Sequence, residues 1–536
     1  MGLDKVKRFV EIQQQDGLSS ALYSTWSYLS PSYFPPVYLR NLDDEIRRYE
    51  LENPEGVVLL PMIPGYTDCL YRQAVIGHAF KIRGYEPVYL FNDGMLPICP
   101  SNTVNSDDNE CGKSCSEFPQ KLSSKFNATA EKLSENTQRD LDEYETLAKD
   151  STPPTFTYRE NDLTSFVQSS LKKYYKRHHI TDLSKRNEGV WNAFCTAAMM
   201  INDATENLLS KYDVEVLVAF EETYIQGGIP LFCGEQAGIT GYSVDWGYKS
   251  QDLVFGKTDN RQYLAWFSDA DLLSEIVDTS LTAEEKNTVD ETMSQRMEGI
   301  NTKSDYVSYD DASVDVEGFD TAIGLFTNLI WDASLEAKEG AYSDPFEWLE
   351  TTLDWFESNP DELLVIKTHP AEAKHGTNQQ VSTWIRDYCG TLPENIILLE
   401  PDSDVNPYVM IRDIDVGIVY NSIIGLEMAY EGIPVIVAGD PHYRDLGFTH
   451  DATNPEDYRE YLDELSQGFD TSSTECLAQR YAHYFFERKH IPVEFYKSEG
   501  TYSRKKYPVT PEDLAGQPYK TVIQRMIEGE PVQFSR

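Results

Sequence analysis

The sequence predicts an α/β protein with two parallel β-sheets, each covered by helices. Three short apolar runs support this, at residues 57–60, 363–366 and 416–419. They are rich in β-branched residues and show no polar alternation, which is typical of parallel strands buried on both faces. Helical patterns separate these runs from the next ones, so the chain alternates strand and helix as doubly wound sheets do.

The length of 536 residues is too great for one hydrophobic core and indicates several compact units. We expect an N-terminal arm at 1–50, a first α/β domain at 51–310, a second at 311–475, and C-terminal helices at 476–536. The polar, acidic stretch 268–320 contains the expected junction, within 300–320. The helices after residue 476 are expected to return to the first domain.

The composition is strongly acidic, with 46 basic against 89 acidic residues and a formal charge of −43. Hydrophobic residues make up 40% of the chain and 34 residues are tyrosine, so this is not a disordered acidic segment. We interpret the charge as that of a halophilic protein that folds in concentrated salt, where screening shortens the range of repulsion. No basic stripe offsets the charge, so nucleic acid is not an expected partner.

The start of the chain lacks an apolar export signal, and no run approaches the roughly 20 apolar residues of a membrane span. We therefore expect a soluble, cytoplasmic protein. The aromatic stretch 23–38 has two interpretations, an arm packed on the body or a segment resting on the inner membrane surface. The packed arm is the simpler one.

The first domain is expected to open with a strand at 57–60, a helix at 68–83 and a strand at 87–91. Helices at 120–150 and 160–210 lead to a strand at 214–220. That strand ends at Glu221 and Glu222, two carboxylates placed where a general base would serve. A helix near 227–238 and a strand near 240–244 follow. The Gly-x-Gly-x-x-Gly fingerprint is absent after the first strand, so no dinucleotide cofactor is expected.

Two further clusters in this domain stay open to more than one interpretation. Cys69, Cys99, Cys111 and Cys115 either bind a structural metal or are reduced thiols, and the spacing matches no standard zinc motif. The densest basic cluster either attracts an anionic substrate or is a solvated helix face. It consists of Lys172, Lys173, Lys176, Arg177, His178 and His179.

The second domain is expected to contain strands at 321–326, 363–366, 395–399 and within 415–438, with a helix at 345–358. Polar side chains follow three of these strands, at the edge where parallel sheets bind ligands. They are Asn328, Asp332, Lys367, His369, Glu372, Asn421, Ser422 and Glu427. His369 is suited to donate a hydrogen bond to a phosphate oxygen. Asn421 and Ser422 precede a helix, a place that favours anions.

These residues form a recognisable pattern. Residues 326–332 (FTNLIWD), 367–372 (KTHPAE), 420–427 (YNSIIGLE) and 432–437 (GIPVIV) resemble the capsule-polysaccharide-biosynthesis glycosyltransferases. The resemblance implies the GT-B fold of two Rossmann-like domains, with a nucleotide-sugar donor held by the second domain and a glycan or lipid-linked glycan acceptor at the first. It also implies that Glu427 holds a ribose hydroxyl and that Glu221 or Glu222 is the base. Thr223 stands where related enzymes have a glycine.

Two other functions remain open at this point. The same architecture serves CDP-polyol phosphotransferases and nucleotide-sugar 2-epimerases, although the former typically have Ser-Ser where this chain has Asn421 and Ser422. A non-catalytic scaffold that keeps the fold is the alternative of another class. No metal is expected to be essential, and the sequence does not define the sugar, the nucleotide or the stereochemical outcome.

Overall fold

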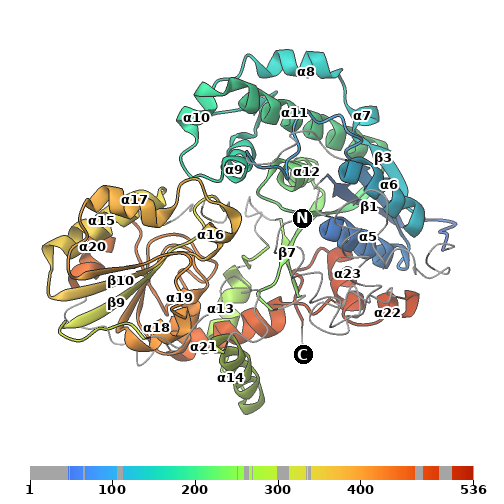
Figure 1. Ribbon diagram of the computed structural model, residues 1–536. Coiled ribbons are helices and arrows are strands. Elements are labelled where there is room, and N and C mark those ends of the chain that lie inside the picture. Colours follow the sequence, from blue (N-terminus) through green and yellow to red (C-terminus); the bar gives the residue numbers. More distant parts are fainter. Residues whose placement is uncertain are drawn as a thin grey trace, which may run out of the picture.

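The computed structural model describes residues 46, 49–63, 67–104, 113–249, 252–258, 265–268, 270–298, 313–332, 335, 340–464, 475–493 and 510–534. Almost all of the predicted arm at 1–50 lies outside these residues. Most of the predicted junction at 300–320 lies outside them as well. Within the described chain, two separate α/β units stand side by side (Figure 1).

The first unit is built on a six-stranded sheet of order β3-β2-β1-β6-β7-β8. β1 pairs in parallel with both β2 and β6, as the apolar runs predict, and only the edge strand β8 is antiparallel within this sheet. The strands are β1 (Gly56–Met62), β2 (Tyr85–Phe91), β3 (Thr129–Lys132), β6 (Val214–Phe220), β7 (Thr240–Trp246) and β8 (Leu253–Lys257). A small hairpin joins β4 (Thr157–Tyr158) to β5 (Asn161–Asp162).

Helices cover both faces of this sheet. Along β1, Val58 and Leu60 pack on one side with α5, α6, α22 and α23, while Leu59 packs on the other side with α7 to α12. This alternation explains why the strand has no polar face. The helices are α5 (Thr67–Lys81), α6 (Lys113–Phe126), α7 (Leu133–Asn136), α8 (Leu141–Ala148), α9 (Thr164–Tyr175), α10 (Thr181–Arg186), α11 (Glu188–Lys211) and α12 (Ile225–Gln236).

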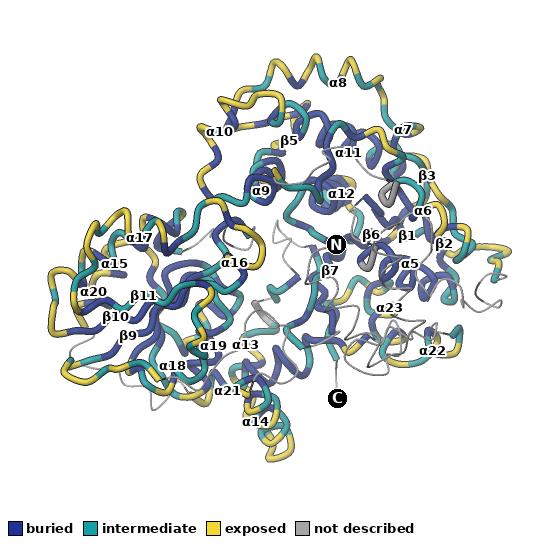
Figure 2. The backbone as a smooth tube through the Cα atoms, in the orientation of Figure 1, coloured by how far each residue is buried: buried dark blue, intermediate teal, exposed yellow. Residues whose placement is uncertain are grey.

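The second unit has a six-stranded sheet of order β11-β10-β9-β12-β13-β14, and all its pairings are parallel. The strands are β9 (Thr321–Phe326), β10 (Glu362–Lys367), β11 (Ile396–Leu399), β12 (Val416–Val419), β13 (Val435–Val437) and β14 (His450–Asp451). Leu363 and Val365 face one core, and Leu364 and Ile366 face the other. The tube coloured by burial shows the central strands β10 and β12 as buried (Figure 2).

One face of the second sheet is covered by α15, α17 and α20, and the other by α18, α19, α21 and two helices from the connection between the units. The bounds are α15 (Pro345–Ser358), α16 (Ala371–His375), α17 (Val381–Cys389), α18 (Pro407–Asp413), α19 (Ile424–Tyr430), α20 (Pro455–Glu464) and α21 (Glu475–His483). The connecting helices are α13 (Ala270–Asp278) and α14 (Ala283–Met297). They pack with the second unit, and the boundary near residue 310 stays a prediction.

The chain returns to the first unit at its end. A π-helix, Tyr484–Lys489, continues α21, and the backbone of Ile491 then exchanges two hydrogen bonds with Leu253 of β8. Next come α22 (Pro511–Ala515) and α23 (Tyr519–Ile527), which pack against α5. The predicted fold class, two Rossmann-like units with a returning C-terminal helix, is confirmed.

None of the helices within the described ranges combines the length and the apolar character that crossing a membrane would need.

Candidate functional site

Thr327 and Asn328, directly after β9, contact the chain that follows the two neighbouring strands, β10 and β12. The hydroxyl of Thr327 accepts a hydrogen bond from the backbone N–H of His369, at 3.0 Å. The side-chain oxygen of Asn328 accepts one from the backbone N–H of Asn421, at 3.1 Å. His369 follows β10 and Asn421 follows β12, so the structure gathers the predicted residues at one edge of the sheet. This edge lies at the reversal of strand order, where open α/β sheets bind ligands.

The imidazole of His369 is fixed in one tautomer. Its Nδ1 lies 3.1 Å from the backbone nitrogen of Ala371, whose N–H donates to it. The neutral ring therefore carries its proton on Nε2. Burial, aided by the nearby His375, lowers the pKa of His369 to about 4. At neutral pH the ring is an uncharged donor, and it also caps the first turn of α16.

The connection after β12 is tightly packed. The side-chain oxygen of Asn421 accepts the N–H of Asp440 at 2.6 Å, and a Cβ on Gly439 would lie only 2.1 Å from that oxygen. The Ser422 carbonyl accepts from the hydroxyl of Tyr443 at 2.6 Å. Helix α19 begins at Ile424 with Ile423 as its N-cap, so Ser422 lies one residue before the cap. The side chain of Ser422 contacts the N–H of Ile424 only at 3.4 Å.

Three other predicted residues near β9 and β10 have different surroundings. Lys367 donates to the carbonyl of Ser403 at 3.1 Å, and burial lowers its pKa to about 8. Glu372 is fully buried, accepts the N–H of Val381 at 3.3 Å, and has a pKa raised to about 8 by burial. Glu372 therefore has a structural role, because its hydrogen bond with Val381 joins α16 to the start of α17. Asp332 lies half-buried in the turn after β9.

Glu427, on α19, is buried and forms an ion pair with Arg296 of α14. Its Oε1 accepts from Nε and Nη2 of that guanidinium, at 2.8 and 2.5 Å, and lies 3.4 Å from the hydroxyl of Tyr408. The carboxylate therefore holds a connecting helix against the second unit. Arg296 sits in a polar, acidic stretch of the sequence, and no motif there marks it.

In the first unit, Glu221 occupies the position directly after β6 in the left-handed region, with φ of 58°. Such a conformation is uncommon for a residue with a side chain and is found at functional sites. Its carboxylate accepts from Lys173 at 2.6 Å and from Gln226 at 2.8 Å, and 18% of the side chain is exposed. Gly227 is required nearby, since a Cβ there would lie 2.0 Å from the carbonyl oxygen of Phe220.

Glu222 has the opposite environment. It is buried, and its Oε1 accepts the backbone N–H of Ala265 at 2.9 Å. Burial, together with the charge of Asp245, raises its pKa well above the usual value. Adjacent residues thus supply a partly exposed, ion-paired carboxylate and a buried neutral acid.

The basic cluster at the C-terminal end of α9 connects the two units. Lys173 holds Glu221, and Lys176 lies over the ring of Trp331, with its Nζ 4.1 Å from the ring centre. The carbonyl of Lys176 accepts the N–H of Asn378 from the second unit, at 3.0 Å. One helix end therefore positions both the candidate base and a loop that follows β9.

Of the four cysteines singled out in the sequence, Cys69 and Cys99 are buried in the first unit. Cys111 and the side chain of Cys115 lie outside the described residues. A metal at these cysteines stays an open alternative.

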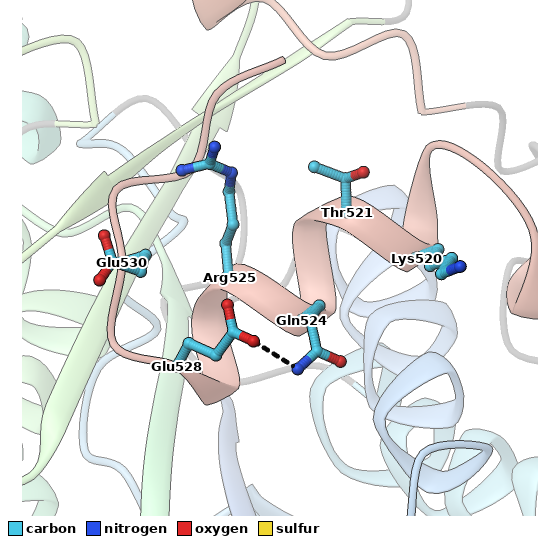
Figure 3. A pocket seen from close by; sticks show the side chains of 6 residues that line it. All are labelled: Lys520, Thr521, Gln524, Arg525, Glu528 and Glu530. Atoms are coloured by element: carbon cyan, nitrogen blue, oxygen red, sulfur yellow. Dashed lines mark hydrogen bonds between the residues drawn. The ribbon is translucent and has the colours of Figure 1, made fainter. Parts of the chain in front are cut away.

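A surface hollow of about 420 Å³ lies along α23 and the turn after it, away from the strand ends. It is lined by Lys520, Thr521, Gln524, Arg525, Glu528 and Glu530. Figure 3 shows these side chains spread along α23 and the turn after it instead of pointing to a common centre, with Gln524 bonded to Glu528. We do not regard it as the active site.

Residues 332–496 match the family model of the capsule polysaccharide biosynthesis proteins. This match covers the predicted motifs from Asp332 onward, so this part of the second unit is similar to the family that the sequence indicated. No curated protein matches the chain significantly.

Several solved structures resemble the chain. The KpsC β-Kdo 2,4-transferase of Thermosulfurimonas dismutans is 14% identical over 50% of this chain and 79% of its own, with a TM-score of 0.34. The KpsC β-Kdo 2,7-transferase of the same organism is 16% identical over 52% and 79%, with a TM-score of 0.32. The UDP-GlcNAc 2-epimerase of Neisseria meningitidis, bound to UDP-GlcNAc, is 10% identical over 79% and 97%, with a TM-score of 0.23.

Proposed function

We propose that this protein is a glycosyltransferase that moves a sugar from a nucleotide-activated donor to a surface polysaccharide or a lipid-linked glycan. The observation that carries the proposal is the joining of His369 and Asn421, both in the segment that matches the capsule family, through Thr327 and Asn328 just before that segment. This edge of the second sheet would hold the donor, and the first unit would hold the acceptor. The reaction would take place in the cytoplasm, at the inner membrane surface when the acceptor is lipid-linked.

In this proposal His369 donates its Nε2–H to a donor phosphate oxygen. Negative charge grows on that phosphate as the nucleotide leaves, so the contact strengthens in the transition state. Asn421 and Ser422 would bind the same phosphates from the end of β12, on the other side of β9. Lys367, Asp332 and Glu427 would contribute to donor binding less directly, since Lys367 and Glu427 already have protein partners.

We assign the base to Glu221 and not to Glu222. A base must be ionised and must reach the acceptor hydroxyl. Glu221 is partly exposed and accepts hydrogen bonds from Lys173 and Gln226, whereas Glu222 is buried with a raised pKa. Glu222 would then serve as a neutral acid that supports the loop around Ala265.

The test is a screen of nucleotide sugars and CDP-polyols with purified protein in concentrated salt. Release of the nucleotide that depends on a glycan acceptor is the expected result. Transfer of a polyol phosphate, or change of the donor sugar without an acceptor, would replace the proposal with one of the two alternatives on this fold. No turnover with any donor and acceptor, and no donor binding by calorimetry, would favour a scaffold.

A further inference from the structure

Two histidines of the first unit meet an aspartate of the second where the units join. His178 and His179 follow α9, and Asp344 is the N-cap of α15. One ligand atom from each lies within 4.8 Å of the others. A side chain of the second unit holds this junction in place. The side-chain oxygen of Gln379 accepts hydrogen bonds from the backbone N–H groups of both histidines, each at 3.1 Å.

The tautomer of His178 follows from its contacts. Its Nδ1 lies 3.2 Å from the carbonyl oxygen of Ile330, which can only accept, so Nδ1 carries the proton. Nε2 then presents a lone pair, and it lies 3.7 Å from Oδ1 of Asp344. His178 is buried and Asp344 is half-buried, and their two electron-rich atoms repel each other unless a cation lies between them. A histidine that donates one ring N–H to a backbone carbonyl is also oriented as metal ligands usually are.

His179 completes the arrangement. Its Nε2 lies 2.7 Å from Oδ2 of Asp344, and half of its side chain is exposed, so the site opens to solvent. Ligand atoms around a tetrahedral zinc ion lie about 3.3 Å apart, given Zn–N bonds of about 2.0–2.1 Å. The two nitrogen–oxygen separations, 2.7 and 3.7 Å, lie on either side of that value.

We propose that His178, His179 and Asp344 form a binding site for a divalent transition-metal ion of the zinc type, which links the two units. Imidazole and carboxylate are ligands that such ions accept, and three protein ligands leave the fourth position for water. The ion would connect the end of α9, which holds Glu221 through Lys173, to the start of α15 in the donor-side unit. The site is separate from the strand ends assigned to catalysis and does not depend on the proposed reaction.

Gln379 controls which ring nitrogen of His179 carries the proton. Its side-chain nitrogen lies 2.9 Å from Nδ1 of His179 and donates to it, so the ring now carries its proton on Nε2. Binding the ion through Nε2 moves that proton, by way of solvent, to Nδ1, and the Gln379 amide must turn aside. In Gln379→Glu, a carboxylate would accept from the two backbone N–H groups and from Nδ1–H together. This is the carboxylate–histidine–metal arrangement, and outer partners of this kind change metal affinity by about 10–100-fold.

The experiment is a titration of the chelator-treated full chain with Co²⁺ and Zn²⁺. We expect the visible absorption bands of tetrahedral cobalt, a rise in melting temperature with zinc, and tighter binding by Gln379→Glu. His179→Asn and Asp344→Asn should lose the bands and the rise, and Asn at 344 can still cap α15. His375→Asn, which removes an exposed imidazole outside the cluster, should behave as wild type. Equal zinc binding by wild type and both site variants, or no cobalt bands in wild type, would overturn the proposal.

Discussion

The two units share one strand order and differ in what their connections carry. Numbered within each unit, both sheets run 3-2-1-4-5-6, and only the last strand differs in direction. The connection from the third to the fourth strand spans 133–213 in the first unit and contains five helices, whereas in the second unit it contains only α18. The long connection supplies α9, whose end holds Glu221 and contacts the second unit.

The comparison teaches that the strand ends of two similar sheets can carry side chains of different chemical character. At the end of β6 the adjacent acids differ in burial, one ion-paired and one neutral. At the ends of β9, β10 and β12 the groups are amides, hydroxyls and a neutral imidazole. In the proposed reaction the first set would take a proton from the acceptor, and the second would stabilise the leaving phosphate.

The largest effect is expected from lowering the salt concentration, and the number of unfolding transitions then shows whether the two units depend on each other for stability. Acidic residues are spread over both, and the net charge is −43. Lowering the salt lengthens the Debye length from ~3 Å at 1 M to ~10 Å at 0.1 M, so repulsion should unfold the protein at low salt. Circular dichroism melts across a potassium chloride series should show one transition that moves to lower temperature. A melting temperature independent of salt contradicts the halophilic interpretation, and two separate transitions would show that the units fold independently.

Glu221→Gln should remove most of the transfer activity. General-base catalysis typically contributes about 10²–10⁴-fold, and glutamine cannot take the acceptor proton. Glutamine keeps an oxygen for Lys173 or Gln226, so the melting temperature should change little. Turnover at saturating donor and acceptor is the measurement. Wild-type turnover would place the base elsewhere.

His369→Asn separates the two roles of His369, which are to accept the N–H of Ala371 and, in the proposal, to donate to the phosphate. Asparagine can still accept the N–H of Ala371 and cap α16, but it lacks the Nε2–H that the proposal directs at the phosphate. Losing one preorganised donor costs on the order of 10²–10³ in rate. The expected outcome is a lower kcat with an unchanged melting temperature. An active His369→Asn alongside an unstable His369→Ala would mean that the residue only caps the helix.

Much of this architecture could be predicted from local patterns. The buried runs at 57–60 and 363–366 became parallel central strands, because strands covered on both faces leave a clear apolar signature. The gathering of His369, Asn328 and Asn421 followed from strand ends sharing one edge.

The sequence could not reveal which acids have charged partners. Arg296 pairs with Glu427 from 131 positions away, and Lys173 reaches Glu221 from 48 positions away. Short strands at the sheet edges, such as β14, carry too few residues for a pattern. The junction of His178 with Asp344 joins separate units and leaves no spacing motif.

Glu372 offers a smaller test within the second unit. Its pKa is raised from 4.5 to about 8 by burial, so the folded state binds a proton that the unfolded state releases. Stability from this group is therefore present below pH 4.5 and is lost as the pH rises toward 8, by about 1.4 kcal/mol for each unit within that window. Glu372→Gln still accepts the Val381 N–H and should remove this slope. Urea unfolding of both proteins from pH 5 to pH 8 measures it, and parallel curves would refute a neutral Glu372.

The smallest effect is expected at Glu222, the acid buried beside the proposed base. Because its pKa is raised well above the usual value, the side chain is already neutral, and glutamine copies its shape and its acceptance of the Ala265 N–H. Glu222→Gln should keep turnover within a few-fold of wild type. It should also melt at a higher temperature than wild type at neutral pH, because the unfolded wild-type chain releases the Glu222 proton above pH 4.5 and this favours unfolding. A loss of about 100-fold in turnover, the size expected for a general base, would reverse the assignment between the two adjacent glutamates.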